Sequence, residues 1–300
     1  MSFSLEIKKE LSEIKNKRPC CRNSFLLGIL ADSKPTETGK IELTVTGTDI
    51  FDIVYKTICA SHKGNVDVTS ETKLGNTIYK ISFTSDKISS HLTQLFQCDS
   101  FDTFFQNIKC TDGNCLKSFL RGVFITLGTA SEPQSGYHLE LKFKNTSHAA
   151  VIYKLLDSEG LEPRIVNRRS GSSVGLYYKN SAVIEDFLTY LGAVRCIFDF
   201  INAKIEREIR NSVNRGTNCV AGNIAKSVNA AQKQVSAIST LVENGKLSLL
   251  PDELFETAKL RLENPSMSLS ELALKHEPPI SKSGLTHRLS KIIEISEELK

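Results

Sequence analysis

In the first third of the chain, hydrophobic residues recur at two different spacings, one typical of helices and one typical of strands. Apolar residues at helical spacing predict helices over residues 2–16, 20–31, 49–60 and 87–96. Strict alternation, as in GKIELTVTG, predicts strands over residues 39–47, 66–69 and 77–84. From the second helix onward, the predicted order is therefore helix, strand, helix, strand, strand, helix.

The same order of elements returns after residue 114. The pattern predicts helices through FLRGVFITLG, AAVIYKLLDSEG and VIEDFLTYLG, and strands at YHLELKFK, 164–168 and 174–179. Residues 52–56 match residues 150–154 at an offset of about 98 positions. So long a period favours two α+β units related by a pseudo-twofold axis over a solenoid. We therefore expect a duplicated domain over 1–194, with halves at about 1–100 and 112–194 sharing one core.

A glycine interrupts the apolar face of the helix that opens each half, namely Gly28 and Gly122. Glycine lets two helix backbones approach closely, so we expect these helices to form the seam. The segments LLGILAD and LRGVFITLG resemble the paired LAGLIDADG helices of homing endonucleases. In those enzymes each helix ends in an acid that helps to bind a divalent metal ion for phosphodiester hydrolysis.

With the glycines aligned, the positions of those acids hold Ser33 and Leu127, and neither is a carboxylate. Asp32 reaches such a position only through a one-residue slip, and we interpret it as a solvated acid just beyond a helix. The resemblance therefore implies the scaffold of a DNA-cleaving enzyme without catalytic residues, so we expect no enzymatic activity.

A mixed-charge helix is predicted over residues 195–216, and we interpret it as a helical linker. Its candidate phosphate contacts are Arg207, Arg210 and Arg215, although a solvated helix with intrahelical ion pairs is the favoured interpretation of these residues. Gly216 is expected to end this helix. A second helix over 218–242 then carries one apolar stripe, formed by Val220, Ile224, Val228, Ala231, Val235, Ile238 and Leu241 or Val242.

The last segment has the pattern of a helix-turn-helix, which makes residues 217–300 an all-α domain. Ser268-Leu269-Ser270-Glu271 is a capping box before a short helix, and a longer helix follows Pro278-Pro279. Leu285, Leu289 and Ile292 share a face and are expected to pack on Leu269, Leu272 and Leu274. The polar residues of the longer helix are Lys282, Ser283, Thr286, His287, Arg288, Ser290 and Lys291.

Such a polar face can donate to phosphates and base edges from the major groove, so double-stranded DNA is the expected partner. Surface helices that only meet water, and helix-turn-helix modules that bind proteins, share this pattern. The formal charge of +4, from 38 Lys and Arg against 34 Asp and Glu, decides nothing by itself.

Neither an export signal nor a membrane-spanning stretch is recognisable, so we expect a cytoplasmic protein without a membrane partner. The eight cysteines include no C-x-x-C pair, and we interpret them as reduced thiols. No cofactor or metal is expected, although Cys110 and Cys115 leave a metal half-site open.

Segments along nearly the whole chain resemble the WhiA family, among them MSFSLEIKKEL, GYHLELKF, NRGTNCVAGNIAKSVNAAQKQ, LPDELFETAKLRLENP and ISKSGLTHRL. The resemblance implies a degenerate LAGLIDADG domain joined to a helix-turn-helix, with DNA binding in the segment that starts at Met267 and ends at Leu299. It also implies a nucleoid-associated transcription regulator of cell division, chromosome segregation or sporulation in a Gram-positive bacterium.

The resemblance leaves the role of the degenerate domain open, and we expect it to contact DNA or a protein partner. Two alternatives for the whole chain also stay open at this point. One is an active homing endonuclease, and the other is a protein-interaction module without DNA binding.

Overall fold

The computed structural model describes residues 2–73, 75–97, 114–168 and 173–298. The chain divides into two compact units, Met1–Arg207 and Glu208–Lys300. Cys98 and Cys110 lie outside the described residues, and so does Leu299.

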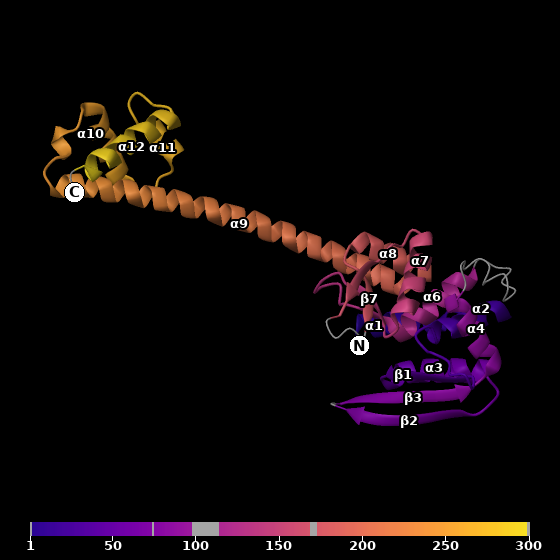
Figure 1. Cartoon of the computed structure of the whole chain (residues 1–300). Coiled ribbons are helices and arrows are strands. Elements are labelled where there is room, and N and C mark those ends of the chain that lie inside the picture. The colour runs from indigo at the N-terminus through magenta and orange to yellow at the C-terminus, as the bar shows by residue number, and fades with distance from the viewer. Residues whose placement is uncertain (1, 74, 98–113, 169–172, 299–300) are drawn as a thin grey trace. The chain divides into compact units, whose positions relative to one another are not determined.

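In its described residues, the first half of unit 1 consists of a three-stranded sheet and four helices. The helices are α1 (Phe3–Glu13), α2 (Pro19–Ile29), α3 (Thr48–Ser61) and α4 (Asp86–Gln97). The strands are β1 (Lys40–Thr46), β2 (Val66–Lys73) and β3 (Asn76–Thr84), in the antiparallel order β1-β3-β2 (Figure 1). All predicted elements are present. Strand β2 is longer than predicted because its second part is exposed and polar, and so carries no hydrophobic alternation.

The second half of unit 1 repeats this arrangement. Its helices are α6 (Asn114–Leu127), α7 (Thr146–Ser158) and α8 (Ser181–Leu191). Its strands are β4 (Gly128–Ala130), β5 (Leu139–Phe143), β6 (Arg164–Asn167) and β7 (Val174–Tyr178), in the order β4-β5-β7-β6. The order β5-β7-β6 matches β1-β3-β2, which confirms the duplication. Among the strands in the described residues, β4 alone has no counterpart in the first half, and its three residues are too few for a periodic pattern to reveal.

The two halves meet along α2 and α6, as the glycines predict. A Cβ atom added at Gly28 would overlap the carbonyl oxygen of Phe119, and one at Gly122 would overlap the carbonyl oxygen of Phe25. Each glycine therefore faces the backbone of the other helix. A single hydrophobic core runs through both halves, with Leu30 and Phe124 fully buried in it.

Helix α9 (Val194–Glu243) is continuous over 50 residues, so the prediction of a helix end at Gly216 is wrong. Gly216 lies inside the helix with open space around its Cα, and a helical glycine costs only about 1 kcal/mol relative to alanine. A cost of that size does not by itself end a helix. The predicted stripe is also buried only at its end: Ile238 and Leu241 are buried, whereas the preceding Val220, Ile224 and Val228 are exposed.

Unit 2 adds a short 3-10 helix, Leu247–Leu249, and the helices α10 (Asp252–Glu263), α11 (Leu269–Leu274) and α12 (Lys282–Glu297). Its core confirms the buried face of Leu285, Leu289 and Ile292, which lie with Leu272 in one cluster and have Leu269 packed against it. The expectation for Leu274 is wrong, because its side chain is 71% exposed. Leu274 is the last residue of α11 and points away from α12's buried face.

The capping box of α11 is confirmed. The amide of Glu271 donates to the Ser268 hydroxyl over 3.3 Å, and the amide of Ser268 donates to the Glu271 carboxylate over 3.1 Å. Within the described part of the chain, no helix is both long enough and apolar enough to cross a membrane.

Candidate nucleic-acid interface

Helix α12 presents a polar face at its N-terminal end. Ser281 caps the helix by accepting from the amide of Gly284 over 3.0 Å. On the side opposite the buried leucines, the exposed residues are Lys282, Ser283, Thr286, His287, Ser290 and Lys291. Lys282, Ser283, Thr286 and His287 line a shallow surface depression. The structure thus brings together six of the seven residues predicted for this face.

Arg288, the seventh predicted residue, turns away from that face. Its guanidinium forms a 3.0 Å ion pair with Glu253, in the first turn of α10, and its side chain is only 21% exposed. This ion pair joins α12 to α10, so the Arg288 side chain does not belong to the exposed group on α12.

A buried arginine fixes the segment that leads into α11. Arg261 is 2% exposed, and its Nε donates to the Gln234 side chain over 2.8 Å while its Nη1 donates to the carbonyl of Met267 over 2.6 Å. Burial lowers the pKa of this guanidinium below its ordinary value. A buried charge without these acceptors would be costly, so Arg261 holds α9, α10 and the turn before α11 in one arrangement.

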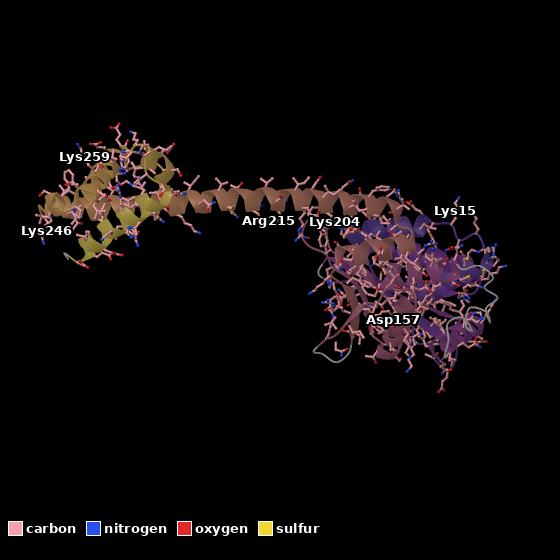
Figure 2. The ribbon with its side chains drawn as sticks, turned by 90° about the horizontal axis from the view of Figure 1, so that it is seen from above. Lys15, Asp157, Lys204, Arg215, Lys246 and Lys259 are labelled. Atoms are coloured by element: carbon pink, nitrogen blue, oxygen red, sulfur yellow. The ribbon has the colours of Figure 1, made fainter. Side chains whose placement is uncertain are left out.

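The three predicted phosphate contacts on α9 differ in their surroundings. Arg207 is half-buried, with its guanidinium 4.9 Å from the ring centroid of Tyr137. Arg210 and Arg215 are exposed, and Arg215 projects from α9 in Figure 2. Arg207 therefore stabilises unit 1 through a cation–π contact, while the other two are accessible to a ligand.

A second polar site lies in unit 1, in the cleft at the C-terminal ends of the seam helices. Ser33 and Leu127 line this cleft, at the positions where the endonuclease pattern requires metal-binding acids. Asp32 also lines it, but its carboxylate accepts from the backbone amides of Lys144 over 2.9 Å and Asn145 over 3.1 Å. The interpretation of Asp32 as a solvated acid is wrong: it joins the first seam helix to the start of α7.

Cationic side chains dominate the cleft. Five of its lining residues are basic and two are acidic; the basic ones are Lys8, Lys80, Lys142, Lys144 and Arg168. Burial, together with the neighbouring positive charge of Lys142, lowers the pKa of Lys8 to about 8. The second acid, Glu42, forms ion pairs with Lys40 over 2.7 Å and Lys80 over 3.0 Å. Both carboxylates thus have partners, and the excess positive charge favours an anion over a metal ion.

Positively charged side chains also lie on one face of the second sheet. The pairing register aligns Glu140, Tyr177 and Arg164 in one row across β5, β7 and β6. Lys142 lies two residues beyond Glu140 and so on the same face. Arg168 reaches the buried Glu140 carboxylate over 2.8 Å, whereas Leu139 and Leu141 point to the core.

Four of these cations were not expected from the sequence, namely Lys8, Lys142, Arg164 and Arg168. For Lys142, the alternation in HLELKF was the available signal, since it assigns this cation to the face opposite Leu139, Leu141 and Phe143. RIVNR gives no such signal, because Val166 falls on the same face as Arg164 and Arg168. Lys8 lies on a helix, and only the fold shows that it lines the cleft.

Relatives of known family match this chain from end to end. A "Probable cell division protein WhiA" of Syntrophomonas wolfei is 31% identical over 100% of this chain and 99% of its own length. A second, from Oceanobacillus iheyensis, is 34% identical over 100% of this chain and 98% of its own length. The chain belongs to the WhiA family.

Two family models place the WhiA domains on the structure. The WhiA LAGLIDADG-like domain matches residues 116–210, and the WhiA C-terminal HTH domain matches residues 213–296. The fold also resembles the crystal structure of full-length WhiA from Thermotoga maritima, with a TM-score of 0.59 and 26% identity, covering 99% of both chains. The exposed face of α12 thus lies in the WhiA HTH domain, and the cationic cleft lies in a LAGLIDADG-like domain whose acid positions hold Ser33 and Leu127.

Proposed function

We propose that this WhiA-family protein is a nucleoid-associated transcription regulator that binds double-stranded DNA through α12. The observation that carries the proposal is the exposed face of Lys282, Ser283, Thr286 and His287 at the start of the second helix of an HTH domain. By its relatives' names and the family resemblance, the regulated process is cell division, with chromosome segregation or sporulation as related roles.

The chemistry of this face suits a DNA groove. Lysine and histidine side chains pair with phosphate oxygens, and the serine and threonine hydroxyls donate to or accept from base edges. The depression is shallow and open, so no small-molecule cofactor is needed to explain it. Leu285 and Leu289 are packed in the core of unit 2, which fixes the orientation of α12 and therefore the direction in which its polar side chains project.

The LAGLIDADG-like domain is proposed to add phosphate contacts and no cleavage. Lys8, Lys142 and Arg168 line the same cleft as Ser33 and Leu127, which stand at the positions where a nuclease would need a carboxylate pair for divalent metal. Positive charge at this site attracts the DNA backbone but repels Mg²⁺. A protein partner at this domain is less well supported, because the exposed sheet face is strongly basic.

The test is binding of the full-length protein to genomic DNA fragments across a salt series with Mg²⁺ present, reading fragment retention and strand integrity together. Affinity that falls steeply with salt, on intact strands, supports the proposal, because counterion release is the signature of phosphate contact. Cut strands would identify a nuclease. An absence of binding at any salt concentration would leave a protein-interaction module.

A further inference from the structure

Three cysteines from the two seam helices converge at the end of the seam opposite the cleft. Cys20 and Cys21 lie in the first turn of α2, and Cys115 lies in the first turn of α6. Their Sγ atoms all lie within 4.8 Å of one another, and those of Cys21 and Cys115 are 3.7 Å apart. Cys21 and Cys115 are buried, and Cys20 is half-buried.

The pseudo-symmetry of the fold explains this convergence. Cys21 precedes Gly28 by seven residues, and Cys115 precedes Gly122 by seven residues. Seven residues are about two helical turns, so each cysteine lies on the same face as its seam glycine. The close backbone contact at the glycines therefore also brings the two equivalent sulfur atoms together. Cys20, the neighbour of Cys21, adds a third sulfur.

We propose that Cys20, Cys21 and Cys115 bind a thiophilic divalent metal ion, with Zn²⁺ the first candidate. In a tetrahedral thiolate site with Zn–S bonds of about 2.3 Å, the sulfur atoms are about 3.8 Å apart. The 3.7 Å between Cys21 and Cys115 matches one edge of such a tetrahedron. A disulfide would require about 2.05 Å; at 3.7 Å the two thiols share a hydrogen bond, and the same spacing accommodates an ion that replaces the shared proton.

The surroundings favour the thiolate form that metal binding requires. All three cysteines lie in the first turns of their helices, where the partial positive charge of a helix N-terminus favours a thiolate over a thiol. Arg121, half-buried on α6, interacts electrostatically with Cys21. The hydroxyl of Ser24, three residues after Cys21, is buried and has no hydrogen-bond partner among the described residues. It is a donor that a metal-bound sulfur would satisfy.

The cysteine cluster lies away from the surfaces proposed to bind DNA. Cys21 and Ser33 lie at opposite ends of the first seam segment, twelve positions apart, so the ion would not act in the cleft. Its expected role is to join the two halves at the start of the seam, where it adds to the free energy of unfolding of unit 1. The proposal therefore stands or falls without reference to the proposed regulator function.

The experiment measures zinc in the untagged full chain, purified in reducing buffer, by elemental mass spectrometry. We expect about one zinc ion per chain in the unaltered protein, and loss of that ion in Cys21→Ser and Cys115→Ser. Cys59→Ser is the matched control, since Cys59 is an exposed cysteine on α3, and it should keep the ion. Equal zinc loss in all three variants would overturn the proposal.

A second arm uses the unaltered chain, so it does not depend on the variants folding. After zinc is removed by a chelator and replaced with Co²⁺, the visible bands of tetrahedral thiolate coordination should appear. The thermal midpoint of unit 1 should fall on chelation and recover on reloading. A chain that takes up neither metal, or that contains a Cys21–Cys115 disulfide instead, would show that the sulfurs do not form a metal site.

Discussion

The carbonyl oxygen of Phe119 occupies the space that a side chain at Gly28 would need, and the carbonyl of Phe25 occupies the equivalent space at Gly122. The two helices that carry these residues are buried along their shared face, with Phe119 and Val123 both inaccessible to solvent. Neither backbone can retreat without opening the core that both halves share.

Replacement of Gly122 by alanine should therefore destabilise unit 1 by at least about 3 kcal/mol, because overpacking here displaces backbone and not a flexible side chain. Chemical denaturation of the full chain, followed by circular dichroism, measures this. Gly222→Ala on α9 is the control, since its Cα faces open space and alanine should stabilise that helix by up to about 1 kcal/mol. A Gly122→Ala protein as stable as the unaltered chain would show that the seam is not closely packed.

Glu10 connects α1 to the start of α9, and this contact should depend on pH. Its carboxylate accepts from the amides of Arg195 over 2.7 Å and Cys196 over 2.9 Å. Burial acts to raise the pKa of Glu10, but the hydrogen bonds from Cys196 and Arg195 outweigh it and hold the pKa below its ordinary value. The stabilisation is therefore present above the pKa of the unfolded chain and is lost as the pH falls through the lower pKa of the folded state.

We expect Glu10→Gln to lower the free energy of unfolding at pH 7 by about 1.5–3 kcal/mol, the contribution of hydrogen bonds to a charged group. The difference from the unaltered chain should shrink as the pH is lowered through the acid range. Denaturation at a series of pH values checks both parts. Glu13→Gln, at a 64% exposed side chain on the same helix, is the control and should have a small effect at every pH.

Two leucines of the HTH domain give a direct comparison of buried and exposed positions. Leu289 is 1% exposed in the core of unit 2, whereas Leu274 is 71% exposed. Leu289→Ala should destabilise unit 2 by about 2–5 kcal/mol through the cavity it leaves, and Leu274→Ala should change its stability by less than about 0.5 kcal/mol. Thermal unfolding of the two variants measures the difference, and equal losses would contradict the assigned core.

Most elements of this fold follow from hydrophobic periodicity, and the features that periodicity missed share a physical cause. The duplicated order of helices and strands was predictable because each element buries one face, as the alternation of Leu139, Leu141 and Phe143 shows. Leu274 was misassigned because α11 has only six residues, and a single turn defines a face poorly. The end predicted at Gly216 failed because a glycine costs a helix interior only about 1 kcal/mol, which does not by itself end a helix.

The site was less predictable than the fold, because its parts come from distant positions. The helical period selected the exposed residues of α12 correctly, but it could not show that Arg288 pairs with Glu253 on another helix. The same limit applies to Asp32, whose partners Lys144 and Asn145 are more than one hundred positions away. The cysteine cluster was missed for this reason too: Cys21 and Cys115 have no C-x-x-C spacing and meet only across the seam.

The basic sheet face of the LAGLIDADG-like domain should contribute to DNA affinity through charge alone. Lys142 lines the cleft and is exposed on β5. Removal of one phosphate contact in Lys142→Ala should reduce the slope of log affinity against log salt by about 1, without changing which sequences bind. Lys154→Ala, which removes an exposed lysine from α7, is the control. If both variants keep the slope of the unaltered chain, DNA does not reach this face.

The recognition face of α12 can be tested by a pair of lysine substitutions with the same change in charge. Lys282 is exposed at the start of α12 and lines the depression with His287, whereas Lys259 projects from α10 (Figure 2). Lys282→Ala and His287→Ala should each weaken binding to a selected genomic site by about 5–100-fold, that is, about 1–3 kcal/mol. Lys259→Ala should leave the DNA affinity within about twofold, since Lys259 does not line the depression on α12.

Fluorescence anisotropy at fixed salt measures the DNA affinity of all three variants. Circular dichroism should show unchanged helix content, because these side chains lie outside the core. If Lys259→Ala weakens binding as much as Lys282→Ala does, overall charge and not the face of α12 determines the affinity, and the proposed recognition helix is wrong.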